Sequence, residues 1–92
     1  MMDDWFLYII QTKNGELYTG ITIDTQKRLD DHRQGRGAKY LRGRGPLQLV
    51  WEVKVGEKRS ALKLEKIIKK FTKSKKKLLI SGHISINELK TS

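Results

Sequence analysis

Two tyrosines, an arginine, a histidine and a glutamate are the residues of this chain best suited to chemistry. Tyr8 and Tyr18 lie ten residues apart on segments with strand propensity, and Arg28 and His32 lie four residues apart. Arginine presents a fixed fork of donors to phosphate, while tyrosine and histidine orient or move protons. A function built on these side chains depends on whether the fold brings them together with Glu65, far along the chain.

The charge of the chain indicates a polyanionic partner. Its 92 residues include 20 Lys and Arg against 10 Asp and Glu, a net charge of +10. Seven of the 20 basic residues fall within 27–44 and ten fall within 58–77. This clustering favours contact with the phosphates of a nucleic acid over a surface that serves solubility alone. An acidic membrane surface is the second possibility.

Composition excludes several kinds of site. The chain has no cysteine, which excludes disulfides and thiolate zinc sites, and two histidines, His32 and His83, are too few for a histidine metal cage. The start at Asp3 and Asp4 is acidic where a secretory signal would be basic, and no apolar run approaches the ~18 residues of a membrane span. We therefore expect a cytoplasmic protein with no membrane partner and no obligate protein partner.

A β-hairpin is predicted near the start of the chain. Residues 5–10 form a continuous apolar and aromatic run, and residues 17–23 are rich in Thr, Tyr and Ile. Both compositions favour strands, and Asn14-Gly15 between them is a hairpin signal.

The loop length decides where the two tyrosines point. A two-residue turn would put Tyr8 and Tyr18 on opposite faces of the sheet. A three-residue loop with its glycine left-handed would pair Thr12 with Glu16, set Tyr8 opposite Gly20, and leave both tyrosines on one face. If both tyrosines serve one site, the second register is required.

Helical periodicity and a further strand predict an α+β domain, a small three-stranded antiparallel sheet flanked by helices in the order ββα-β-αα. The elements expected after the hairpin are a helix over 25–34, a mobile basic loop over 35–46, a strand over 47–55, a helix over 58–72 and a short helix over 75–80. We expect one domain over 1–82, with 83–92 as a C-terminal tail that forms an added strand or a frayed end. Glu65 falls inside the apolar arc of its helix, which argues against a simple surface pair with Lys69.

In this order and at this spacing, the residues resemble the GIY-YIG nuclease superfamily. Phe6-Leu7-Tyr8 matches the first motif with its glycine and isoleucine replaced and its tyrosine kept, and Tyr18-Thr19-Gly20 matches the second. Arg28 matches the arginine of the first helix, His32 the His/Tyr position four residues on, and Glu65 the metal-binding glutamate of a later helix.

The resemblance extends over roughly residues 5–80. Residues 35–40, Pro46 and residues 77–80 are similar to the small stand-alone bacterial members of the YhbQ type. Two features depart from the superfamily pattern: the asparagine that often follows the glutamate has no counterpart, and we expect no second domain to choose a target.

The resemblance implies a metal-dependent endonuclease that hydrolyses phosphodiester bonds in DNA, with one Mg²⁺ or Mn²⁺ per site. Glu65 would hold the ion, and Arg28 would bind the phosphate in the transition state. Tyr8 would align or deprotonate the attacking water, in a role that Tyr18 could exchange with it. His32 would orient water or protonate the leaving group. We expect the positive field of the chain to lower the pKa of Tyr8 from its ordinary value of ~10.

Further residues are expected to bind the substrate. Gly20, which lacks a side chain, would let the scissile phosphate approach the sheet. The basic residues expected to contact backbone phosphates are Lys39, Arg42, Arg44, Lys69 and Lys73.

Two alternatives remain from other functional classes. A non-catalytic nucleic-acid-binding module would use the same basic surface, and the altered first motif and the missing asparagine favour it. An adaptor for an acidic protein would bind that protein in a salt-sensitive way without preferring DNA.

Overall fold

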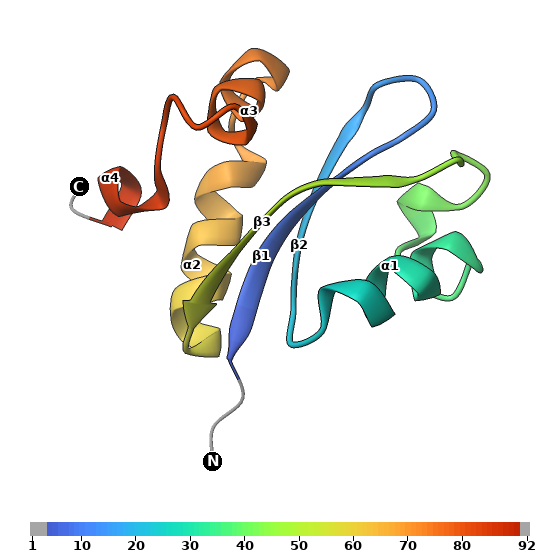
Figure 1. Ribbon diagram of the computed structural model, residues 1–92, viewed down its shortest axis with the longest axis horizontal. Helices are drawn as coiled ribbons and strands as arrows, with labels where there is room; N and C mark the ends of the chain where they lie inside the picture. Colours follow the sequence, from blue (N-terminus) through green and yellow to red (C-terminus); the bar gives the residue numbers. More distant parts are fainter. Residues whose placement is uncertain (1–3, 91–92) are drawn as a thin grey trace.

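The computed structural model describes residues 4–90 as a three-stranded antiparallel sheet with helices on both faces (Figure 1). The strands, in the spatial order β2-β1-β3, are β1 (Trp5–Gln11), β2 (Leu17–Thr22) and β3 (Gln48–Gly56). The helices are α1 (Thr25–Arg33), the 3-10 turn η1 (Lys39–Leu41), α2 (Lys58–Lys69), α3 (Lys73–Ile80) and α4 (Ile86–Lys90). The predicted α+β class and its small antiparallel sheet are confirmed.

The central strand β1 is covered on both faces. Leu7, Tyr8, Ile9 and Ile10 are each 2% exposed or less. Alternate side chains of a strand point to opposite faces, so β1 contributes to two cores. Leu7 and Ile9 pack with α2 and α3, while Tyr8 and Ile10 pack with α1 and the segment that follows it. Figure 1 shows α2 and α1 on opposite sides of the sheet.

The hairpin between β1 and β2 has the three-residue loop. The Thr12 amide donates to the Glu16 carbonyl at 2.9 Å, and Gly15 has φ +85°, a conformation that glycine adopts without strain. The resulting register sets Tyr8 opposite Gly20. It is therefore the register that puts Tyr8 and Tyr18 on one face.

The two helices next to the hairpin begin at side-chain caps. Asp24 accepts from the amide of Lys27 at the start of α1, and Thr72 accepts from the amide of Lys75 at the start of α3. The segment predicted as a mobile basic loop contains η1, whose Leu41 is 1% exposed and packs on the core beside α1. This segment is thus anchored to the sheet.

The tail is neither an added strand nor a frayed end, so that prediction is wrong over the residues described. Residues Ile86–Lys90 form α4, and Ile86 is 8% exposed in the core built by β1, α2 and α3. The weak apolar alternation of this segment reflects packing against Leu79 and its neighbours rather than a strand period. Residues 91–92 lie outside the described part, and the division of the chain at residue 82 stays a prediction.

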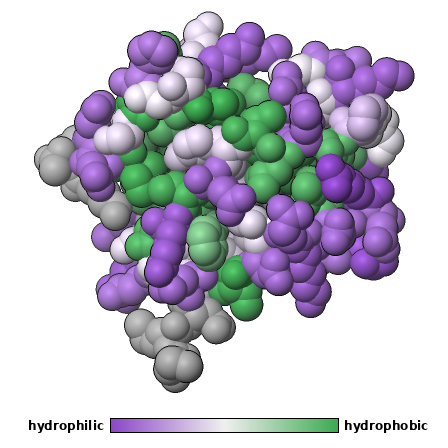
Figure 2. All heavy atoms as spheres, viewed as in Figure 1, coloured by the Kyte–Doolittle hydropathy of each residue, from purple (hydrophilic) through white to green (hydrophobic). Residues whose placement is uncertain are grey.

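The outer strand β3 leaves apolar surface exposed. None of its side chains is fully buried. Figure 2, in the orientation of Figure 1, shows hydrophobic residues gathered in the middle of this face and hydrophilic residues around them. Within residues 4–90, no helix is long and apolar enough to cross a membrane.

The two adjacent isoleucines of α2 provide a matched test of the core. Ile68 is 0% exposed and Ile67 is 38% exposed. We expect Ile68→Ala to lower the free energy of unfolding by about 2–5 kcal/mol, because it leaves a cavity, and Ile67→Ala to lower it by much less. Urea unfolding followed by circular dichroism measures both. Equal losses would contradict the packing of α2 described above.

Candidate active site around Tyr8

The Tyr8 hydroxyl is the point at which the predicted catalytic residues meet. Its side chain is 2% exposed on the α1 face of the sheet. The hydroxyl lies 2.9 Å from Nε2 of His32, which α1 carries. A buried hydroxyl needs a hydrogen-bond partner, and His32, itself 2% exposed, is that partner.

The hydrogen bonds of His32 settle which ring nitrogen carries the proton. The backbone amide of Ala38 donates to Nδ1 at 3.1 Å, so Nδ1 holds a lone pair. Burial, and then the charge of Arg28, hold the pKa of His32 below its ordinary value, so the ring is neutral at neutral pH. A neutral ring with a free Nδ1 carries its hydrogen on Nε2. Nε2 therefore donates to the Tyr8 oxygen, and the phenolic hydrogen of Tyr8 remains available to another acceptor.

Three further predicted residues act on the same hydroxyl. Burial raises the pKa of Tyr8 to about 12, although the Arg28 guanidinium beside the hydroxyl lowers that pKa through a hydrogen bond and its charge. The neighbouring Tyr18 and Glu65 raise the Tyr8 pKa further through their charges. The expectation that the positive field lowers this pKa is thus wrong. Desolvation at a buried site outweighs the nearby cation.

Aromatic rings line the site from β1, β2, α1 and η1. The centroids of Tyr8 and Tyr18 are 6.5 Å apart, and Tyr18 meets His32 edge to face at 5.7 Å. Tyr40 stacks on Tyr18 at 6.0 Å with an interplanar angle of 19°. These tilted and stacked contacts are favourable arrangements for aromatic rings. Tyr18 is only half-buried, so it is the tyrosine of the pair with access to solvent.

Glu65 lies on α2 and is coupled to the site by charge. Its side chain is 18% exposed, and Oε2 is 3.4 Å from Nζ of Lys69, one helical turn on. The prediction that Glu65 does not form a simple surface pair with Lys69 is therefore wrong. Lys69 lies at an exposed position, and its long side chain reaches back to the carboxylate. Such an i,i+4 pair contributes only about 0.3–0.5 kcal/mol, so a stronger cation can displace it.

The basic residues of the 35–46 segment are mostly engaged. Arg44 is 2.6 Å from Glu16 and 4.3 Å from the Tyr40 ring, so it fixes the hairpin to the segment around η1. Arg42 donates to the Gly35 carbonyl at 3.1 Å. Lys39 is exposed at the start of η1. These predicted phosphate contacts therefore differ in how free they are to bind.

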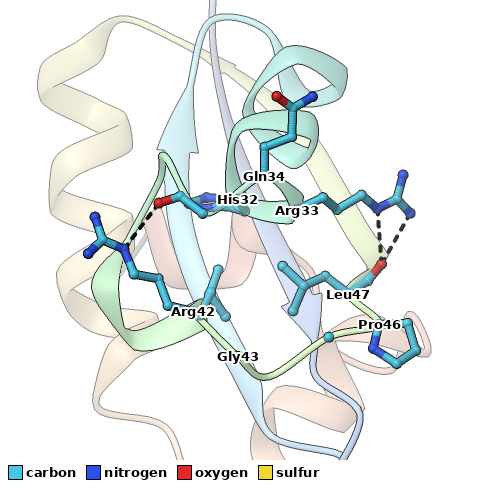
Figure 3. A pocket seen from close by; sticks show the side chains of 10 residues that line it. His32, Arg33, Gln34, Arg42, Gly43, Pro46 and Leu47 are labelled. Atoms are coloured by element: carbon cyan, nitrogen blue, oxygen red, sulfur yellow. Dashed lines mark hydrogen bonds between the residues drawn. The ribbon is translucent and has the colours of Figure 1, made fainter.

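A groove runs behind His32, between the end of α1 and the residues that follow η1. Figure 3 shows Arg33 and Arg42 on its walls, each donating to a backbone carbonyl. Leu41 and Leu47 form part of its lining. The groove adjoins the site through His32.

Two glycines make the Tyr8–His32 arrangement possible. A Cβ on Gly20 would overlap the Tyr8 hydroxyl, because the phenol lies across the β2 backbone at that point. A Cβ on Gly37 would overlap the His32 ring. Close approach of this kind admits only glycine. Gly20 therefore leaves room for the Tyr8 side chain, and its contact with a phosphate stays a prediction.

The residues that could bind a metal are few. Within residues 4–90, no group of three or more His, Cys, Asp or Glu side chains is arranged to hold an ion. A single partly exposed carboxylate, Glu65, is compatible with Mg²⁺, which keeps several waters and is often bound through one or two carboxylates together with substrate phosphates. It does not fit a closed structural metal site.

Comparison with known proteins identifies the family. The model of the GIY-YIG catalytic domain matches residues 4–78. The chain belongs to the GIY-YIG family. GIY-YIG domains have a nuclease-like fold, typically use a divalent metal, and point to a nucleic-acid substrate. The resemblance drawn from the motifs is confirmed.

Relatives place the chain among the UPF0213 proteins of the GIY-YIG family. A UPF0213 protein of Vibrio cholerae is 49% identical over 92% of this chain and 85% of its own length. The UPF0213 protein YhbQ of Escherichia coli is 44% identical over 99% of this chain and 91% of its own length. The YhbQ type proposed from the sequence is therefore the right branch.

A solved structure agrees on the fold. The solution NMR structure of the UPF0213 protein BH0048 from Bacillus halodurans is 40% identical and has a TM-score of 0.56. That match covers 85% of this chain and 83% of the other. The small GIY-YIG sheet with its helices is thus shared.

Sequence reasoning missed three members of the site. Gly37 leaves room for the His32 ring, and the Ala38 amide donates a hydrogen bond to that ring. Glu16 forms an ion pair with Arg44. The Glu16–Arg44 pair spans 28 residues, so no local spacing signals it. Gly37 belongs to the glycine-rich segment 35–46 and to the stretch 35–40 that resembles the YhbQ type, but neither feature indicated a contact with His32.

Gly20→Ala tests the close packing of the phenol. We expect the added methyl group to displace the Tyr8 hydroxyl from His32, because both cannot occupy the same space. NMR signals of the His32 ring should then shift toward those of an imidazole without this bond. Gly45→Ala is the control, because its nearest foreign atom is 3.9 Å from the new Cβ. Unchanged His32 signals in Gly20→Ala would contradict the described geometry.

The lowered pKa of His32 predicts a pH dependence. The unfolded chain takes up the proton near the ordinary value of 6.5, whereas the folded chain takes it up only at lower pH. Stability from this group is therefore present above pH ~6.5 and is lost as the pH falls toward the folded pKa. We expect the difference in unfolding free energy between the wild type and His32→Gln to shrink across this window. A constant or growing difference would show that His32 is not buried in its neutral form.

Proposed function

We propose that this protein is a metal-dependent endonuclease that hydrolyses phosphodiester bonds in DNA. The observation that carries the proposal is the convergence of Arg28, His32, Tyr18 and Glu65 on the hydroxyl of Tyr8. These side chains combine a phosphate-binding cation, hydrogen-bond donors and a carboxylate in one place. Membership of the GIY-YIG family and a net charge of +10 support the same substrate class.

Glu65 is the residue proposed to hold a single Mg²⁺ or Mn²⁺. When bound, the ion would neutralise charge on the phosphate and lower the pKa of the attacking water. The weak pair of Glu65 with Lys69 would be exchanged for the ion, and Lys69 would then be released to contact the nucleic-acid backbone.

Each remaining residue has a role that follows from its contacts. Arg28, half-buried beside the Tyr8 hydroxyl, binds the phosphate oxygens whose charge grows in the transition state. Tyr8 has a pKa of about 12, so it is protonated at neutral pH and aligns the attacking water instead of deprotonating it. His32 holds the Tyr8 oxygen in place through Nε2 and does not protonate the leaving group, because its ring is neutral. Tyr18 is the solvent-facing tyrosine that completes the site.

Plasmid cleavage with matched glutamate variants tests the proposal. We expect the wild type to nick supercoiled plasmid with Mg²⁺ or Mn²⁺, and Glu65→Gln to lose this activity because the amide cannot replace the charged ligand. Glu57→Gln, an exposed residue before α2 with no side-chain capping bond, should cut as the wild type does. Equal metal-dependent cutting by the wild type and Glu65→Gln would contradict the assignment of Glu65.

The second candidate is a non-catalytic nucleic-acid-binding module. The observation that favours it is the single carboxylate at the site, together with the burial of Tyr8, which is 2% exposed. Salt-sensitive binding of DNA by both the wild type and Glu65→Gln, with no cleavage of plasmid or branched DNA by either, would establish this candidate instead.

A further inference from the structure

A lysine of α3 is buried next to the hairpin. Lys76 is 9% exposed, and its Nζ donates to the carbonyl of Leu17 at 3.2 Å. Leu17 begins β2 and directly precedes Tyr18. The ammonium group therefore lies beside the start of β2, although Lys76 is 59 residues away from Leu17 in the sequence.

This ammonium is incompletely satisfied. A lysine has three N–H donors, and within residues 4–90 the Leu17 carbonyl is its one hydrogen-bond acceptor. No carboxylate there forms an ion pair with it. Burial and the charge of Lys69 lower the pKa of Lys76. A buried cation without a counterion is costly, and an anion that reaches it gains correspondingly.

Two further lysines surround the same place. Lys69 is close enough to Lys76 for its charge to act on it, and it pairs with Glu65. Lys73 extends its Nζ to the hairpin loop, 3.3 Å from the point where a Cβ on Gly15 would lie. The three lysines thus line the path from Glu65 to the hairpin, and two of them lack a carboxylate partner in the described structure.

We propose that Lys76, with Lys69 and Lys73, forms a binding site for a second backbone phosphate, next to the phosphate held at Arg28 and Tyr8. The inference rests on the proposed function for its substrate class, a nucleic-acid strand. The incoming phosphate takes the free N–H donors of Lys76 and supplies its missing counterion. The strand then runs from the catalytic cluster along the β2 side of α2 and α3.

The test is the salt dependence of DNA binding, measured without metal so that cleavage plays no part. The probe is a fluorescein-labelled DNA oligonucleotide, single-stranded and as a duplex, followed by fluorescence anisotropy. Lys76→Gln keeps a donor for the Leu17 carbonyl and removes the charge, Lys76→Met removes both, and Lys76→Arg keeps the charge. Lys77→Met is the control, because this neighbour on α3 is exposed.

We expect Lys76→Gln and Lys76→Met to bind more weakly. The plot of log affinity against log salt should become less steep. Its slope should decrease in magnitude by about 0.9 for the duplex and about 0.7 for the single strand, because one phosphate contact is lost. Lys76→Arg and Lys77→Met should keep the wild-type slope. Lys76→Gln and Lys76→Met should melt no earlier than the wild type, since they remove a buried charge.

An unchanged slope in folded Lys76→Gln would overturn the inference. If that variant also melted at a lower temperature than the wild type, Lys76 would have only a structural role, holding α3 against β2.

Failure of the nuclease proposal would give a different set of results. DNA binding with the expected loss of slope but no cleavage would leave the phosphate site standing and remove the catalytic function. No DNA binding by the wild type at low salt would remove both.

Discussion

The packing of β1 between two helical layers is the constraint on which the site depends. A strand covered on both faces buries the side chains of its middle, and β1 buries Tyr8 there among the aliphatic residues Leu7, Ile9 and Ile10. A buried phenol is costly unless its oxygen finds a partner. α1 supplies His32 as that partner, and Ala38 fixes the ring of His32 in turn. Gly20 and Gly37 leave the space that both rings need.

This arrangement creates an electrostatic contrast between the centre of the site and its surroundings. At its centre, Tyr8 and His32 are both neutral at neutral pH, because burial disfavours the charged form of each. Around them lies a chain with a net charge of +10. Glu65, whose nearest ion-pair partner is Lys69, is the carboxylate that acts on the Tyr8 hydroxyl. Under the proposed function, the positive surface would attract a phosphate group and the neutral centre would orient it.

The sequence could predict the features that depend on local signals or on the family motifs. Local signals were sufficient for the three strands and for α1, α2 and α3, because each of these elements depends mainly on neighbouring residues. The hairpin admitted two registers, and only the requirement that Tyr8 and Tyr18 share one face selected the observed one. The family motifs, taken in their order along the chain, assigned Arg28, His32 and Glu65 to the same site as the two tyrosines. Helical or strand periodicity alone could not have made that assignment.

What the sequence could not predict depended on long-range packing. The pKa of Tyr8 follows from burial, which composition does not reveal, so reasoning from net charge gave the wrong direction. The Glu16–Arg44 pair and the Lys76–Leu17 bond join segments far apart in the chain. The tail resembled a weak strand because Ile84 and Ile86 alternate with polar residues, yet both pack on the core with Leu89, around the short helix α4.

The central claim is that Tyr8 and His32 act in catalysis as one hydrogen-bonded unit. A double-mutant cycle on the rate of metal-dependent plasmid nicking tests it most directly, using Tyr8→Phe, His32→Gln and the double variant. If His32 acts through the Tyr8 oxygen, the double variant should cut no more slowly than the slower single variant. Rate losses that multiply in the double variant, or single variants that cut as fast as the wild type, would contradict the account.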